Sequence, residues 1–197
     1  MFVSFITLFK NNCLSYPQRS ALSYKEKNYS YEELNRRSNQ LAYYLEQQDI
    51  KKGMTVAIIS RNYLERIVCI LSLWKLGAAH LPIDPNYPST RINFILDDSK
   101  VNFVITDSEV YKNSILNTTQ VFIILNDKNK KISALPVDNL SDSSEFNDTA
   151  YIAYTSGSTG EPKGVIITQG NISSIYSAWK KVYKLTCSDQ HLQIANF

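Results

Sequence analysis

The chain has 197 residues, of which 44% are hydrophobic and 20% charged, and these are values of a globular protein rather than a disordered one. Its formal net charge is only +3, and Lys and Arg are scattered, so it lacks the basic stripe that nucleic-acid binding needs. Cys13, Cys69 and Cys187 stand far apart without a C-x-x-C pair, which argues against a disulfide framework or a zinc site and predicts free thiols in a reducing compartment.

The first ten residues, MFVSFITLFK, are apolar, but no basic residue precedes the apolar run and no small-residue cleavage pattern follows it. The run is also too short to span a bilayer. We therefore expect a short amphipathic helix that packs on the domain, no membrane association, and a cytoplasmic protein.

A helix is predicted over Tyr31–Gln47. Ser30 and Glu33 form an S-x-x-E capping box, in which each side chain satisfies a backbone N–H, and leucines then recur at helical spacing. Short apolar segments alternate with helical patterns after this point, which indicates an α/β fold with a mainly parallel sheet flanked by helices. The predicted strands are Thr55–Ser60, Ala78–Ile83, Val101–Thr106 and Val121–Leu125, and the predicted helices are Leu64–Leu76 and Pro88–Asp98.

The polar segment Asn126–Thr149 is expected to be a long surface loop inside one domain, because the α/β pattern resumes directly after it. Strands are predicted at Tyr151–Tyr154 and Val165–Ile167. An amphipathic helix follows, and His191–Phe197 resembles the start of another strand. The apolar positions of that helix are Ile172, Ile175, Tyr176, Trp179, Val182 and Tyr183.

The segment with the clearest chemistry is YTSGSTGEPKG, residues 154–164. Its glycines allow tight turns and bring backbone N–H groups close to a ligand, and its hydroxyl groups add uncharged donors. Lys163 supplies a cation. Many donors, close backbone access and a positive charge are what a polyphosphate needs.

Two other interpretations of this segment are a nucleotide-binding P-loop and a flexible linker. The P-loop pattern G-x-x-x-x-G-K-[ST] does not fit, because Lys163 follows Pro162 and precedes Gly164. A flexible Ser/Gly linker is the common explanation for such a composition. The strands that directly flank the segment and the Pro-Lys pair at its end favour phosphate binding.

YTSGSTGEPKGV resembles the signature phosphate loop of the adenylate-forming superfamily, which includes peptide-synthetase adenylation domains, acyl-CoA ligases and luciferases. LGAAHLPIDPNYPSTRINFILDDS, residues 76–99, is similar to the second core motif of amino-acid adenylation domains, and YSYEEL, residues 29–34, to their first. The motifs stand in family order, and the resemblance covers nearly the whole chain. The run P-I-D-P-x-Y-P is less typical of acyl-CoA ligases.

The resemblance implies that a carboxylate, most typically an amino acid, attacks the α-phosphorus of Mg-ATP to give an acyl adenylate and pyrophosphate. The thiol of a carrier protein's phosphopantetheine arm then takes the acyl group. Thr155 is implied to help place Mg²⁺, and no nucleophile or general base is assigned within the chain. The residues implied to hold the β- and γ-phosphates are Thr155, Ser156, Gly157, Ser158, Thr159, Gly160 and Lys163.

The second motif is expected to be structural, with its polar and aromatic residues shaping a turn and capping a helix. These residues are Asp84, Pro85, Tyr87, Pro88 and Arg91. His80 stands where the resemblance implies an aromatic residue, so a packing role is expected, and Trp74 and Trp179 are candidates for the core. Gln169 stands where many relatives have His, a departure that bears on contacts to the substrate.

The resemblance also implies later motifs that the chain does not contain, namely those that bind ribose, select the substrate and supply a C-terminal lysine. Residues 1–197 are therefore expected to be the N-terminal part of an adenylation domain, truncated at its C-terminal end and inactive alone. The alternatives are a non-catalytic remnant with weak phosphate binding and part of an acyl-CoA or aryl-acid ligase.

Overall fold

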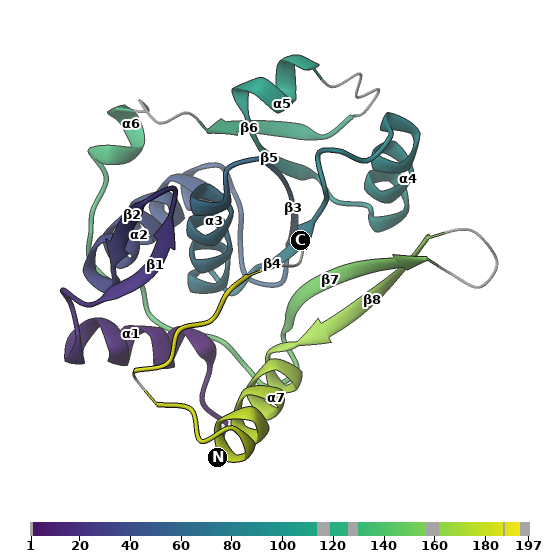
Figure 1. Cartoon of the computed structure of the whole chain (residues 1–197). Coiled ribbons are helices and arrows are strands. Elements are labelled where there is room, and N and C mark those ends of the chain that lie inside the picture. The colour runs from purple at the N-terminus through teal and green to yellow at the C-terminus, as the bar shows by residue number, and fades with distance from the viewer. Residues whose placement is uncertain (1, 114–118, 126–129, 157–161, 187, 194–197) are drawn as a thin grey trace.

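A computed structural model describes residues 2–113, 119–125, 130–156, 162–186 and 188–193. Its centre is a six-stranded sheet in the order β6-β5-β3-β4-β7-β8, in which only the β7–β8 pair is antiparallel (Figure 1). The strands are β3 (Thr55–Ile59), β4 (Ala79–Pro82), β5 (Phe103–Asp107), β6 (Val121–Leu125), β7 (Thr149–Ser156) and β8 (Pro162–Thr168). The mainly parallel α/β class predicted from the sequence is confirmed.

Helices cover both faces of the sheet, so the core has two halves. In β3, Val56 and Ile58 point to the helices α2 (Tyr31–Gln47) and α3 (Tyr63–Lys75). Ala57 and Ile59 point to the other face, where α4 (Ser89–Ser99) and α5 (Ser108–Asn113) lie. Strands buried on both faces are nearly continuous apolar runs, which is why TVAIIS indicated a central parallel strand.

Three helices and a hairpin complete the described chain. The hairpin of β1 (Ser20–Tyr24) and β2 (Lys27–Ser30) packs beside α2, and α1 (Phe5–Ser15) lies near α2, α3 and α7 (Gln169–Val182). The one-turn helix α6 (Lys130–Ser133) contacts α2. No helix among the described residues is long and apolar enough to cross a membrane.

The polar segment after β6 is fastened to the N-terminal helices. Residues 126–129 lie outside the described part, α6 follows, and residues 134–148 have no regular structure. The side chain of Asn39 donates to the carbonyl of Val137 at 2.6 Å, and Lys10 Nζ donates to the carbonyl of Leu140 at 2.5 Å. Asp142 accepts hydrogen bonds from the hydroxyls of Ser4 and Thr7. These bonds hold the segment against α1 and α2.

Several expectations need correction. The capping box at α2 is half formed: Ser30 Oγ accepts from the Glu33 backbone N–H at 3.1 Å, but the Glu33 carboxylate pairs with Arg37. α7 has a complete capping box, formed by Thr168 and Asn171. The strand expected at His191–Phe197 is absent from its described residues, 191–193. The β1–β2 hairpin and α5 were not predicted.

Gly77 ends α3 in a left-handed conformation with φ +69°, and a Cβ there would lie 2.9 Å from Lys52 Cγ. We expect Gly77→Ala to lower the free energy of unfolding by about 2 kcal/mol, measured by urea denaturation, because it adds backbone strain and crowds Lys52. Gly53→Ala is the matched control: φ is +82°, but nothing lies within 4 Å of the added Cβ. Equal losses in both variants would exclude the crowding.

Candidate phosphate-binding hairpin

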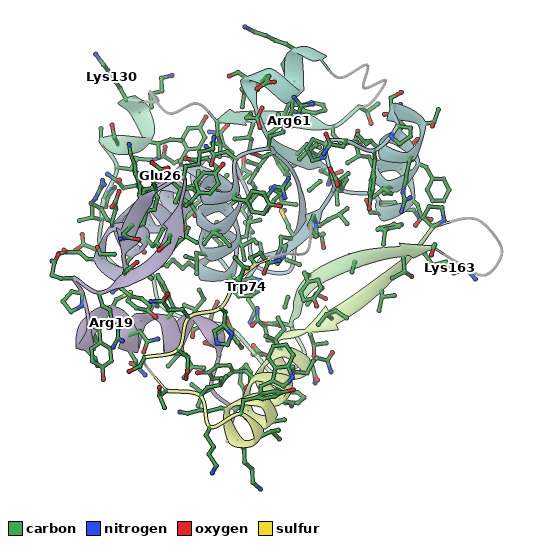
Figure 2. All side chains as sticks on the ribbon, viewed as in Figure 1. Arg19, Glu26, Arg61, Trp74, Lys130 and Lys163 are labelled. Carbon is green, nitrogen blue, oxygen red and sulfur yellow. The ribbon has the colours of Figure 1, made fainter. Side chains whose placement is uncertain are left out.

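The polar loop of the sequence joins two antiparallel strands. Thr155 pairs with Lys163 and Ser156 with Pro162, so the last described residues of β7 and the first of β8 stand side by side. Gly157, Ser158, Thr159 and Gly160 lie outside the described residues, and the roles expected of them stay predictions. Figure 2 shows Lys163 at the end of the hairpin that projects from the body of the molecule.

Cross-strand pairing decides which groups can act together at the tip. Residues directly opposite each other in an antiparallel pair share a face, so the Thr155 hydroxyl and the Lys163 amine face the same side. Thr155, Ser156 and Lys163 are exposed, and no carboxylate in the described part of the chain forms an ion pair with Lys163. A cation beside a hydroxyl, both open to solvent, can receive an anionic oxygen.

The base of the hairpin is anchored by aromatic side chains. Trp74 donates its indole N–H to the carbonyl of Ala150 at 2.9 Å, and the rings of His80 and Tyr151 stack with centroids 5.4 Å apart. The backbone pairing of β7 with β4 is limited to one residue pair, Tyr151 with His80. These contacts therefore supplement a short backbone pairing.

A second anchor lies nearer the tip. The hydroxyl of Tyr154 donates to the carboxylate of Asp98, in the last turn of α4, at 2.5 Å. Gly164 stands opposite Tyr154, and a Cβ at this position would lie 3.2 Å from the tyrosine ring. The absence of a side chain at Gly164 thus leaves room for the ring. No pattern in the sequence indicates this link, which joins two residues 56 positions apart in different motifs.

We expect Tyr154→Phe to raise amide hydrogen exchange in β7 and β8 about fivefold, because removing one net hydrogen bond costs about 1 kcal/mol. Mass-spectrometric exchange of peptides from the hairpin measures the change. Tyr111→Phe is the control, since Tyr111 is an exposed tyrosine whose ring contacts Phe122. Unchanged exchange in the hairpin would show that the Asp98 bond does not hold it.

The second motif has the structural role that was expected. Asp84 Oδ1 accepts from the Asn86 backbone N–H at 2.9 Å, and the carbonyl of Asp84 accepts from Tyr87 N–H at 3.1 Å. The Arg91 guanidinium lies 4.1 Å from the centre of the Tyr87 ring. Pro88 is the N-cap of α4, which lacks a side-chain cap. This motif shapes a turn and starts a helix.

Of the aromatic side chains expected to pack in the core, two are packed against other rings and one is exposed. His80 is buried, in ring contact with both Trp74 and Tyr151, so its packing role and that of Trp74 agree with expectation. Trp179 is 56% exposed and was wrongly placed in the core. It lies on a face of α7 that has no covering element among the described residues. The periodic pattern predicted the amphipathic helix but not which surface it would meet.

No group of three or more His, Cys, Asp or Glu side chains that could hold a metal is present among the described residues. The expected magnesium role of Thr155 therefore stays a prediction.

Cys13 and Cys69 are buried free thiols, and Cys187 lies outside the described part. Gln169 is buried, and its backbone N–H donates to the carbonyl of Asp148 at 2.8 Å.

The chain is similar to known proteins in both sequence and fold. Residues 9–197 match the family described as AMP-binding enzyme. The chain is 34% identical over 189 residues to bacitracin synthase 3 of Bacillus licheniformis, covering 96% of the chain and 3% of that protein. The nonribosomal peptide synthetase FmoA3 has a TM-score of 0.84 at 21% identity, covering 95% of the chain and 19% of FmoA3. A fatty acyl-CoA synthetase of Mycobacterium tuberculosis has a TM-score of 0.79 at 24% identity, covering 90% and 37%. The chain thus spans a small share of each.

Proposed function

The chain belongs to the AMP-binding enzyme family, and from this premise we propose that it is part of an ATP-dependent ligase that activates an amino acid as its acyl adenylate. The exposed pair of Thr155 and Lys163 at the hairpin tip is the observation that carries the proposal. These groups would bind the β- and γ-phosphates and neutralise charge on the leaving pyrophosphate. The similarity to peptide synthetases favours an amino acid over other carboxylates.

ATP is the proposed nucleotide, and FmoA3 has been solved with AMPPNP bound, which supports it. The hydroxyl of Thr155 is proposed to help place Mg²⁺, whose charge would reduce repulsion between the phosphates and the incoming carboxylate. Ser156 and the loop residues Gly157, Ser158, Thr159 and Gly160 would add donors. The acyl group would pass to the phosphopantetheine thiol of a carrier protein in the cytoplasm, a compartment that suits the free buried thiols of Cys13 and Cys69.

Residues 1–197 are proposed to be the N-terminal part of a larger adenylation domain. α7 and β8 expose large apolar side chains, which a folded domain normally covers. These are Ile166 at 61%, Ile175 at 51%, Trp179 at 56% and Val182 at 70% exposed. The small share of FmoA3 and of bacitracin synthase 3 that the chain spans supports the same proposal.

Pyrophosphate exchange into ATP tests the function. In the longer protein that contains this chain, we expect amino-acid-dependent exchange, and we expect Lys163→Gln to lower it 10- to 100-fold, since a hydrogen bond to a charged oxygen contributes about 1.5–3 kcal/mol. Lys112→Gln, at an exposed position of α5, is the control.

The 197-residue chain alone should show no exchange. Exchange with fatty or aryl acids in place of amino acids would favour the acyl-CoA or aryl-acid ligase alternative. No exchange with any carboxylate would favour the non-catalytic remnant.

A further inference from the structure

A second candidate site lies away from the β7–β8 hairpin. An open cavity of about 520 Å³ is lined by the β1–β2 hairpin, α2, the first turns of α3, the end of β6 and α6. Figure 2 shows the turn of the β1–β2 hairpin, marked by Glu26, far from Lys163. The volume falls in the range of small-molecule sites. Leu125, the last residue of β6, and Asn62, three residues after the end of β3, line the cavity. It therefore lies on the side of the sheet where parallel strands end, as ligand sites of α/β proteins do.

The lining of the cavity is strongly biased in charge. Among the described residues that line it, four are cationic and only Glu65 is acidic. The cations are Lys25, Lys27, Arg36 and Arg37. Arg37 is paired with Glu33, but no described carboxylate forms an ion pair with Lys25, Lys27 or Arg36. The excess of cations over carboxylates in the described lining makes the rim attractive to an anion.

The guanidinium groups are already held in position. Arg36 Nη1 donates to Gln40 Oε1 at 3.1 Å, and Gln40 in turn donates to the carbonyl of Ser133 at 2.7 Å. Arg37 donates to Glu33 at 3.1 Å, and its guanidinium lies 5.4 Å from the centre of the Tyr29 ring. An arginine whose geometry is fixed in advance loses less entropy when it binds carboxylate or phosphate.

Four apolar side chains from α2, α3 and β6 also line the cavity, and we call them its floor. Leu41, Leu64, Val68 and Leu125 line the cavity and are buried. The rings of Tyr24 and Tyr29 form the wall on the side of the β1–β2 hairpin. A ligand that fills this space needs an apolar body under its charged group, so inorganic phosphate would leave the floor unused.

We propose that this cavity binds a small organic anion, a carboxylate or phosphate ester that carries an apolar ring or chain. The anionic group would contact Lys27 and Arg36, and the apolar part would lie against Leu64 and Val68. The proposal does not rest on the ligase function, because the cavity shares no residue with the β7–β8 hairpin.

The test uses 1-naphthyl phosphate as the probe. 1-Naphthol, which lacks the phosphate group, and inorganic phosphate, which lacks the aromatic ring, serve as comparison ligands. Binding to the purified 197-residue chain is followed by amide chemical shifts. We expect the probe to move signals of the β1–β2 hairpin and of residues 36–41 and 62–68, and to bind at least tenfold more tightly than either comparison ligand. Raising the salt concentration should weaken binding.

Variants separate the cavity from other surfaces. Lys27→Gln with Arg36→Gln should weaken binding of the probe at least tenfold, because two charge-assisted contacts are lost. Lys180→Gln with Lys181→Gln removes two exposed cations from α7 and should leave binding unchanged. Unfolding followed by circular dichroism confirms that each variant is folded.

Shifts confined to the exposed apolar residues of α7, or equal affinity of the Lys27/Arg36 variant and the wild type, would overturn the proposal. Neither result would affect the proposed function. Conversely, loss of pyrophosphate exchange in Lys163→Gln with normal probe binding would leave the cavity proposal standing.

Discussion

Acid should destabilise this protein through His80. We expect the free energy of unfolding to fall by about 1.4 kcal/mol for each pH unit below 6.5, and by on the order of 4 kcal/mol at pH 3. Burial lowers the pKa of His80 from 6.5 to about 3, opposed by a hydrogen bond to the Ala150 backbone. A loss of this size is comparable with the whole stability of an ordinary domain.

The cause is the environment of the ring. His80 is only 5% exposed, between the rings of Trp74 and Tyr151, and charging it there would place a cation in an apolar layer. Between pH 3 and 6.5 the unfolded chain binds a proton that the folded protein does not. The stability is therefore fully present above pH 6.5 and is lost as the pH falls toward 3.

Urea denaturation at pH 4 and pH 7 measures the effect, with His80→Phe as the test variant. Phenylalanine keeps the ring contacts and cannot be protonated, so we expect the variant to lose about 3 kcal/mol less than the wild type between these pH values. His191→Gln, at an exposed position, is the control. A wild type and a His80→Phe variant with the same dependence on pH would refute this role.

The sequence predicted the elements that depend on local pattern. Tyr31–Gln47 and Val121–Leu125 agree with the structure residue for residue, because apolar spacing and capping signals are properties of neighbouring residues. The β1–β2 hairpin was missed because Lys25 and Glu26 form its turn with φ of 48° and 63°. Asn or Gly is usual at such positions, so the turn carries no recognisable signal.

The candidate site was predictable only as far as composition and resemblance reach. They located Thr155, Ser156 and Lys163, and pairing of the two strands then put Thr155 beside Lys163. The bond from Tyr154 to Asp98 could not be predicted, since it depends on where α4 ends relative to the hairpin. The exposed side of α7 was misjudged for a related reason: an amphipathic pattern does not say which neighbour covers it.

Lys75 should give the second large effect, in alkaline solution. Burial lowers the pKa of Lys75 from 10.5 to about 7, partly opposed by Cys13 and reinforced by Lys10. We expect the free energy of unfolding to rise by about 1.4 kcal/mol per pH unit from pH 7 to pH 9, a gain of roughly 3 kcal/mol. In this range the unfolded chain still binds the proton that the folded protein has released.

The pKa of Lys75 is lowered because its amine is buried and contacts neutral hydrogen-bonding groups. Lys75 is 2% exposed, and its Nζ contacts Ser38 Oγ at 2.6 Å and Asn39 Oδ1 at 2.6 Å, with Asn35 Oδ1 at 2.8 Å. No carboxylate that the structure describes forms an ion pair with it. Hydrogen bonds alone do not repay the lost hydration of a buried ammonium, so the neutral form is favoured.

The gain should end near pH 9, because two thiols act in the opposite direction. Burial raises the pKa of Cys13 to about 11 and that of Cys69 well above 9. Above pH 9 the unfolded chain loses thiol protons that the folded protein retains, so stability falls with pH. Lys75 and the thiols together predict a stability maximum close to pH 9.

Denaturation curves at pH 6, 7, 8 and 9 decide the matter, with Lys75→Met as the variant. Methionine removes the titrating group but leaves the oxygens of Ser38 and Asn39 without a donor, so the variant is expected to be less stable at pH 9. The slope against pH is the informative quantity, and it should be nearly flat between pH 7 and 9. Lys112→Met, at an exposed position of α5, should keep the wild-type slope. If the wild type is no more stable at pH 9 than at pH 7, the buried amine is compensated by a charge, and its neutral form is not the one the fold selects.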